Sequence, residues 1–202
     1  MRSHEQAITC IGGYLRHSRD QGIIFKPDKT KDVECYVDAD FAGGWNQKDP
    51  DNASNLMSRT GFVIKYADCP IFFASKLQTE IALSTAEAEY IALSTALRQV
   101  IPLMIQMEEI NDVFPLYINK PDFYCKVWED NQSCIAMANA QKFSPRTKHI
   151  ALKYHHFRSF AEGENLRIRI NYIHTEKQQA DIFTKPVRPD LFMKLRFMLM
   201  GW

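Results

Sequence analysis

Apolar and polar residues alternate from Glu34 to Gly43, which predicts a β-strand with two different faces. One face is apolar and holds Cys35, Val37, Ala39 and Phe41. The other face holds Tyr36 and two acids, Asp38 and Asp40. Two further strands are predicted after a polar loop, at Gly61–Tyr66 and Ile71–Lys76, and the short turn between them indicates a hairpin. Together these three strands predict an antiparallel meander.

The second half of the chain alternates between helical and strand patterns. Ser84 is predicted to begin a helix, and Pro102 is predicted to kink or end it. Two more strands are predicted at Phe123–Glu129 and Leu166–Ile173. Asp130 is suited to cap the helix that follows it. The remaining predicted helices are Asn131–Ala140, Ile150–Ala161, Lys177–Thr184 and Pro189–Met200.

The first thirty or so residues differ from the rest. Residues 4–18 predict a short helix, Gly22–Lys26 predicts a strand, and Pro27–Asp32 predicts a turn or linker. We therefore expect three parts: a connection segment at 1–32, a main domain at 33–187, and a helical tail at 188–202.

The order of the elements predicts an α/β fold built on a mixed five-stranded sheet, with three antiparallel strands, then two parallel ones, flanked by helices. The first and fourth strands would lie side by side, which would bring Asp38 and Asp130 to neighbouring strand ends. Ligands of such sheets gather at the carboxyl ends of the strands.

Four acids stand out in their local contexts: Asp38, Glu89, Asp130 and Asp181. Carboxylates drawn together from distant segments repel one another and are tolerated mainly where a hard cation neutralises them. Ser84 and Glu87 fit a capping box, so Glu87 has a structural task at the helix start. Glu89 instead lies on a small apolar face of the helix. The pattern favours a nuclease that uses two magnesium ions.

Composition adds few constraints. Lys and Arg number 25 and Asp and Glu 24, so the net charge of +1 neither argues for nor excludes nucleic-acid binding. Five cysteines without a CxxC pair predict reduced thiols in the core of an intracellular protein. No stretch approaches the ~20 apolar residues of a membrane span, and the N-terminus lacks the apolar core of a signal peptide. The spacing of His149, His155, His156 and Cys125 fits no standard zinc site.

Six segments carry a family resemblance: YVDADFAGGW, SRTGFVIKY, SKLQTEIALSTAEAEYIALS, EDNQSCIAMAN, PRTKHIALKYHHFR and YIHTEKQQADIFTKP. They run from about Glu34 to Pro186, and in this order they resemble the ribonuclease H domain of copia-type LTR-retrotransposon Pol polyproteins. The residues before them resemble the segment that joins the reverse transcriptase to the ribonuclease H.

The resemblance implies the ribonuclease H fold and hydrolysis of the RNA strand of RNA–DNA hybrids during reverse transcription. It implies two Mg²⁺ ions, for which Mn²⁺ can substitute. Asp38 would bridge both ions, Glu89 and Asp130 would hold the ion near the leaving group, and Asp181 would hold the ion that activates water. His174 matches the flexible active-site histidine. The implied partners are the hybrid and the reverse transcriptase of the same polyprotein, in the cytoplasm or a virus-like particle.

Substrate contacts are predicted around these acids. Ser84 and Thr85 precede Glu89, and Asn131 and Gln132 follow Asp130, at the spacing where relatives place polar minor-groove contacts. The predicted phosphate contacts are the basic residues Arg59, Arg146, Lys148 and Lys185.

Two other functions stay open. Integrases and transposases share the fold but place the glutamate last, on the final helix, whereas Glu89 comes second here. A non-catalytic hybrid-binding or structural module that needs its reverse transcriptase is the other alternative, although all four acids are intact. Strand alternation also leaves Asp40 beside Asp38 without an assigned role.

Overall fold

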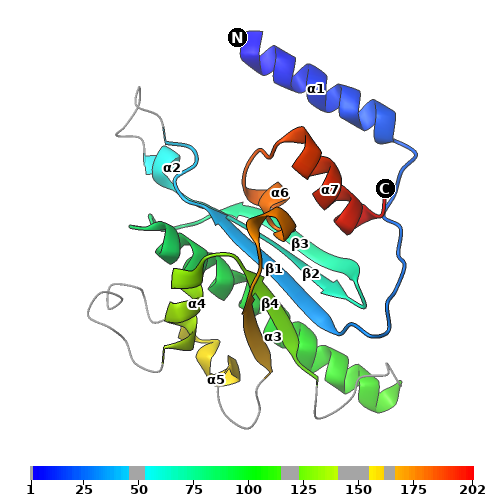
Figure 1. Ribbon diagram of the computed structural model, residues 1–202, viewed down its shortest axis with the longest axis vertical. Helices are drawn as coiled ribbons and strands as arrows, with labels where there is room; N and C mark the ends of the chain where they lie inside the picture. The colour runs from blue at the N-terminus through cyan, green and yellow to red at the C-terminus, as the bar shows by residue number, and fades with distance from the viewer. Residues whose placement is uncertain (1, 46–52, 115–122, 141–154, 162–166) are drawn as a thin grey trace.

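Five strands form one mixed sheet at the centre of the computed structural model (Figure 1). The structure describes residues 2–45, 53–114, 123–140, 155–161 and 167–202. The strands lie in the order β3-β2-β1-β4-β5. Their bounds are β1 Val33–Asp40, β2 Arg59–Tyr66, β3 Cys69–Leu77, β4 Cys125–Glu129 and β5 Ile168–Tyr172. Antiparallel pairing joins β1, β2 and β3, and parallel pairing joins β1, β4 and β5, which confirms the predicted fold class.

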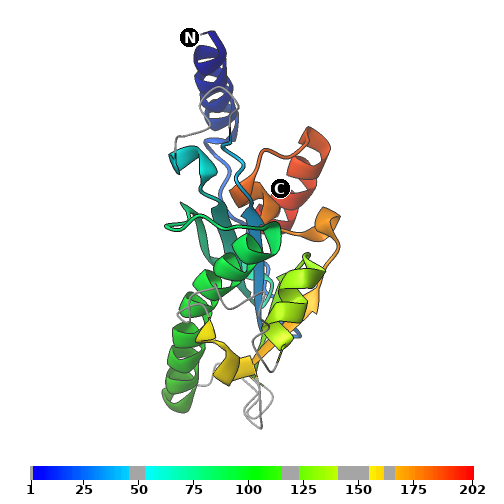
Figure 2. The same cartoon turned by 90° about the vertical axis from the view of Figure 1, so that its left-hand side faces the viewer.

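Helices cover both faces of this sheet. Those on one side are α3 Thr85–Val113, α4 Gln132–Asn139 and α5 Arg158–Ala161, and those on the other are α6 Asp181–Thr184 and α7 Pro189–Met200. Figure 2 shows the sheet between α3 and α7. Three further helices are α1 Arg2–Ser18, α2 Ala53–Leu56 and the 3₁₀ helix η3 Thr175–Lys177. No helix within the described residues is long and apolar enough to cross a membrane.

The alternation along β1 separates two apolar cores. Val33, Cys35 and Val37 are fully buried against α3 in the larger core. Tyr36 points to the opposite face and packs with Val63 and the C-terminal helices in the smaller core. Because Asp38 follows Tyr36 at an interval of two, it lies on the face that α6 covers.

Helix α3 continues through Pro102, so the helix does not end there, which was one of the two predicted outcomes. Proline removes one backbone donor from a helix, and that loss is tolerated when the surrounding turns are held by tertiary packing. Pro102 itself is exposed, while Val100 and Met104 on either side of it are buried in the core. Packing on the sheet therefore carries the helix on to Val113.

Other local predictions also need correction. Residues 22–26 were predicted as a strand, but they are irregular. Within the described residues this segment pairs with no strand, and Ile24 N donates a backbone hydrogen bond to Met200 O in the last helix. Asn131 caps α4, because its side-chain oxygen accepts from Ser133 N and Cys134 N; Asp130 does not cap it. The run predicted as one helix at 177–184 is the end of η3 followed by the short helix α6. Of the helix predicted at 150–161, only α5 is α-helical in the described part.

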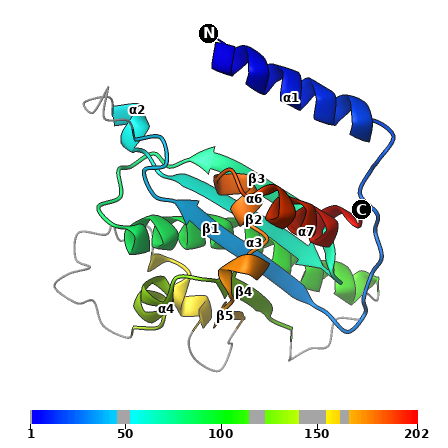
Figure 3. The ribbon, with the colours of Figure 1, turned by 45° about the horizontal axis from the view of Figure 1, so that its top comes forward.

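The segment that follows α1 lies against the C-terminal end of the chain. Trp202 Nε1 donates to Gly22 O at 2.9 Å, and Ile24 N donates to Met200 O at 2.9 Å. The Arg196 guanidinium lies 4.0 Å from the centre of the Trp202 ring. Figure 3 shows the segment after α1 passing the C-terminal end of α7, with α1 itself standing away from the sheet. The division at 32 and 188 stays a prediction.

Candidate active site

The site forms where β1 and β4 stop pairing. Their parallel register ends at Tyr36 and Trp128, and Asp38 and Asp130 each lie two residues farther along. Gln178 is fully buried and donates to the carbonyls of Val37 at 2.9 Å and Trp128 at 3.2 Å. One amide side chain therefore satisfies carbonyls of both separating strands and fills the space between them. The two aspartates are left at the open end of this gap.

Helix α3 delivers the glutamate. The Ser84 hydroxyl accepts from Glu87 N at 3.1 Å, and Glu87 Oε2 accepts from Leu83 N at 2.8 Å. This pair of bonds confines the Glu87 carboxylate to the helix start. Glu89 is buried two residues farther in, on the side of α3 that meets the sheet.

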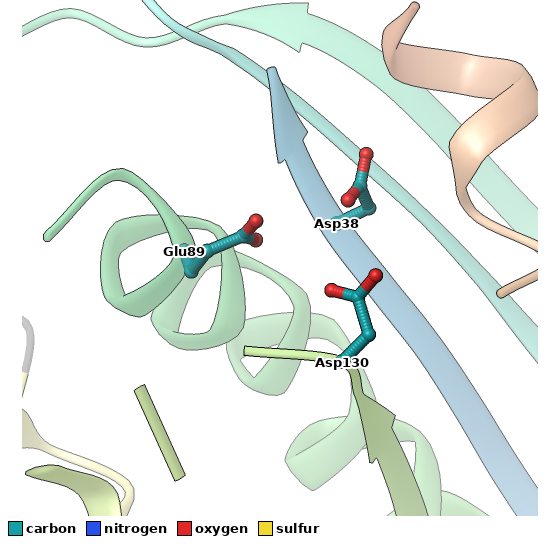
Figure 4. A group of neighbouring side chains, drawn as sticks. All are labelled: Asp38, Glu89 and Asp130. Atoms are coloured by element: carbon teal, nitrogen blue, oxygen red, sulfur yellow. The ribbon is translucent and has the colours of Figure 1, made fainter. Parts of the chain in front are cut away.

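Three carboxylates converge at the end of the sheet. One oxygen from each of Asp38, Glu89 and Asp130 lies within 4.8 Å of the others. Figure 4 shows the three side chains pointing toward one another from β1, α3 and the residue after β4. Among the described residues, the buried Glu89 Oε2 has no hydrogen-bond partner. A buried acceptor without a donor, among all-oxygen neighbours, is the environment that a hard divalent cation would satisfy.

Burial and mutual repulsion dominate the electrostatics of this cluster. The pKa of Glu89 is raised to about 11, by burial first and then by the carboxylates of Glu129, Asp38 and Asp130. Burial also raises the pKa of Asp38, against the opposing effects of Lys185 and Thr184. Without a cation in the cluster, burial and the neighbouring carboxylates therefore favour the protonated form of the Glu89 carboxyl. A cation in the cluster would favour the ionised form and reverse the shift.

Another buried acid, Glu129, lies next to the cluster and was not predicted from the sequence. Glu129 is 0% exposed, and its Oε1 accepts from Asn131 N at 3.0 Å. Burial is the main cause that raises its pKa to about 8, with Asp130 and Asp38 adding to the rise and the Asn131 backbone opposing it. The signal was present in the strand pattern, because Glu129 shares the inward side of β4 with Cys125 and Val127.

Asp181 lies outside the three-carboxylate cluster and faces a lysine. The Lys185 ammonium is 3.0 Å from Asp181 Oδ1 and 3.4 Å from Asp38 Oδ1. The Thr184 hydroxyl donates to the other oxygen of Asp38. Burial, then Asp38, raises the pKa of Asp181 to about 7, although Lys185 opposes the rise. Lys185, which the sequence suggested as a phosphate contact, therefore points at two of the four acids in this structure.

Helix α6 reaches Asp38 because Gly61 lets it approach. Gly61 pairs with Asp38 across β1 and β2. A Cβ at this position would lie 2.5 Å from Thr184 Cγ2, 2.9 Å from Phe183 Cβ and 3.2 Å from Ala180 O. The absent side chain is the reason that Thr184 and Lys185 can contact Asp38.

Gly61→Ala is expected to destabilise the protein by about 1–3 kcal/mol, because the added methyl group overpacks the contact with α6. The free energy of unfolding from urea titration measures the effect. Gly22→Ala is the matched control, since a Cβ at Gly22 has nothing within 4 Å. Equal stability of the Gly61 and Gly22 variants would show that α6 does not depend on this close contact.

The predicted histidine lies at the rim. His174 is exposed and caps η3, with its Nδ1 accepting from Glu176 N at 3.3 Å. The next residue, Thr175, donates to Asp130 Oδ2 at 2.7 Å. This bond ties the histidine loop to the cluster, and nothing in the sequence pattern had pointed to Thr175.

The predicted substrate contacts are distributed around the same end of the sheet. Ser84 and Thr85 are exposed at the start of α3, and Gln132 is exposed at the start of α4. Asn131 is half-buried and occupied in capping α4. Arg59 Nη1 donates to Ser75 Oγ at 3.3 Å. Arg146 and Lys148 lie outside the described residues.

Two histidines that had raised the question of zinc hold α3 in place. The Tyr90 hydroxyl and His155 Nδ1 are hydrogen-bonded at 2.6 Å, and Ser94 Oγ and His156 Nδ1 at 3.4 Å. Tyr90 follows Glu89 directly. These contacts therefore fix the turn of α3 that carries the site glutamate.

Comparisons with known proteins identify relatives among the polyproteins of plant transposons. No protein-family model matches the chain. It is 32% identical over 191 residues to the retrovirus-related Pol polyprotein from transposon TNT 1-94 of Nicotiana tabacum, a match that covers 95% of this chain and 13% of the polyprotein. It is 29% identical over 190 residues to the corresponding polyprotein from transposon RE1 of Arabidopsis thaliana, covering 94% and 12%. The solved structure of LC11-RNase H1 in complex with an RNA/DNA hybrid has 17% identity and a TM-score of 0.46, covering 75% of this chain and 93% of that one.

The mixed sheet of order β3-β2-β1-β4-β5 is of the ribonuclease H type, and it carries carboxylates at the ends of β1 and β4. The chain's homologues are copia-type retrotransposon Pol polyproteins, whose matching segments cover 91–95% of the chain. The chain spans 12–13% of the length of these Pol polyproteins.

Proposed function

We propose that this domain is an endoribonuclease that hydrolyses the RNA strand of RNA–DNA hybrids with the help of two divalent cations. The observation that carries the proposal is the convergence of Asp38, Glu89 and Asp130 within 4.8 Å. The order of the acids along the chain, with the glutamate second on α3, supports a ribonuclease H in preference to an integrase. The relatives are Pol polyproteins, so the reverse transcriptase of the same polyprotein is the proposed partner.

The donor set fits magnesium or manganese. All of the converging groups are carboxylates, and hard divalent cations of this kind prefer carboxylate and water oxygens. Asp38, Glu89 and Asp130 would hold one ion, and Asp38 with Asp181 would hold the other. When bound, the two ions would supply charge neutralisation at the attacking and leaving oxygens of the phosphodiester.

The protein's own residues orient these ligands. Thr184 holds one oxygen of Asp38, and Thr175 holds one oxygen of Asp130. Gln178 keeps the ends of β1 and β4 apart, which sets the distance between the two aspartates. Fixed carboxylates need little reorganisation as charge develops in the reaction, which is the condition for effective electrostatic catalysis.

The hybrid would lie across the ends of α3 and α4. The exposed polar side chains of Ser84, Thr85 and Gln132 are available there for 2′-hydroxyls and base edges of the minor groove. Such contacts respond to the shape of the duplex, so cleavage should depend little on sequence. His174, exposed at the rim, would move a proton or assist product release.

Cleavage of a labelled RNA–DNA hybrid in Mg²⁺ or Mn²⁺ tests the proposal. Glu89→Gln is expected to reduce the cleavage rate by about 10²-fold or more, because the amide cannot neutralise a cation. Glu87→Gln is the matched control: it removes the same charge two residues away, but from a carboxylate that caps α3. It should retain cleavage at a temperature where the protein is folded.

Three outcomes would contradict the proposal. Equal cleavage by the wild type and Glu89→Gln would remove Glu89 from the site. Greater loss in Glu87→Gln than in Glu89→Gln would reverse the assignment of the two glutamates. Binding of the hybrid by the wild type without cleavage would favour a non-catalytic binding module.

A further inference from the structure

The four site acids fall into two unlike groups. Asp38, Glu89 and Asp130 form an open cluster in which one carboxylate oxygen has no donor among the described residues. Asp38 and Asp181, in contrast, already share a cation, the ammonium of Lys185. Asp38 belongs to both groups. The structure thus holds one positive charge where two-ion chemistry requires a divalent cation.

Lys185 is placed to leave this position. Its side chain is 34% exposed, whereas those of Asp38 and Asp181 are 1% and 2% exposed. The acids are held inside the protein, and the lysine enters from solvent on a flexible four-carbon stem. Lys185 also follows the last residue of α6, so rotation of its side chain breaks no contact of the helix backbone. Movement of the ammonium is therefore possible without movement of α6.

Resting on the proposed function, we propose that the Lys185 ammonium holds the position between Asp38 and Asp181 that the second divalent cation takes. Without nucleic acid the site then binds one divalent cation tightly, at Asp38, Glu89 and Asp130, and a second only weakly, at high concentration, where it displaces the ammonium. A phosphate of the bound hybrid offers Lys185 another anionic partner, and the second cation enters as the ammonium departs. Bound hybrid then raises the affinity for the second cation, and the bound second cation raises the affinity for the hybrid by the same factor.

A purely structural ion pair is the competing interpretation. Asp181 and Lys185 are separated by four residues along the chain, a spacing at which opposite charges stabilise a helix. In that case Lys185 would stay in place whether or not cations bind, and its loss would lower stability without changing the number of cations bound.

Calorimetric titration of the nucleic-acid-free protein with Mn²⁺ distinguishes the proposed role of Lys185 from a structural ion pair. The wild type is expected to bind one ion and Lys185→Met two, because the variant leaves Asp38 and Asp181 without a cation. Lys185→Arg keeps the charge and should bind one. Lys194→Met, which removes an exposed charge on α7, is the matched control and should also bind one.

The possible results are distinct. One ion in both the wild type and Lys185→Met would overturn the inference, as would two ions in the wild type at the first, tight step. If neither the wild type nor any of the three lysine variants bound Mn²⁺, the result would instead count against the cation cluster of the proposed function.

A second measurement uses the wild type alone, so it does not depend on the folding of a variant. Acetylation of each lysine is followed by mass spectrometry while Mn²⁺ is raised. Modification of Lys185 should stay constant as the first ion binds and rise several-fold as the second binds, while that of Lys194 stays constant. Constant modification of Lys185 through both steps would show that the lysine does not move, and would refute the proposal.

Discussion

Replacing Asp38 with asparagine is expected to slow hybrid cleavage by at least about 10²–10³-fold. Asp38 is the one described carboxylate that lies both in the cluster with Glu89 and Asp130 and beside Lys185 and Asp181. An amide keeps the shape of the side chain but not its charge, so both cation positions are weakened together. Initial rates on a labelled hybrid, at saturating Mg²⁺, measure the effect.

Asp40→Asn is the matched control for this experiment. Asp40 lies on the same strand, and its carboxylate packs against Gly43, away from the cluster. The structure thus separates two acids that strand alternation places on one face. If Asp40→Asn lost cleavage and Asp38→Asn kept it, then Asp40 would belong to the active site and the assignment of Asp38 would be wrong.

The metal-free protein is expected to lose stability as the pH rises from about 4 to about 8. The pKa of Asp181 is raised from 3.8 to about 7 and that of Glu129 from 4.5 to about 8, mainly by burial. Below the ordinary values both acids are protonated in the folded and the unfolded protein, and their contribution is fully present. Between the ordinary and the raised values the folded state binds more protons, so the free energy of unfolding falls with increasing pH.

Divalent cations should reverse this dependence. A bound cation favours the ionised carboxylates, so added Mg²⁺ or Mn²⁺ should stabilise the protein most at the upper end of the range. Urea unfolding at several pH values, with chelator and with Mn²⁺, measures both curves. Glu129→Gln should flatten the metal-free curve, since it removes one raised pKa. A metal-free stability that rises from pH 5 to 8 would show that these acids are not protonated in the folded protein.

Much of the fold followed from local pattern. Strict alternation in the first strand, two apolar runs around a short turn, and a capping box at Ser84 predicted β1, β2, β3 and the start of α3. These signals are local, because each depends on residues within a few positions of one another. Two predictions made from local pattern alone were wrong. Pro102 does not end α3, since the sheet holds the turns on both sides, and residues 22–26 form no strand, since among the described residues they have no neighbouring strand to pair with.

The site also combines residues that the sequence predicted with residues that only the tertiary structure identified. Motif order selected Asp38, Glu89, Asp130 and Asp181, and the structure brings the first three together. The partners of these acids could not be read from the sequence. Gln178, Thr175 and Thr184 are ordinary polar residues in the chain, and only their contacts with β1, Asp130 and Asp38 give them a part in the site.

By itself the sequence determined the fold class of this protein, the order of its strands and the glutamate on α3 that lies in the acid cluster. Those properties are encoded in spacing, alternation and capping, which act over short distances along the chain. The tertiary structure alone decided that Asp181 faces Lys185 and that Glu129 is buried beside the cluster. Burial and charge pairing depend on which distant segments meet, and here they meet where β1 and β4 separate around Gln178.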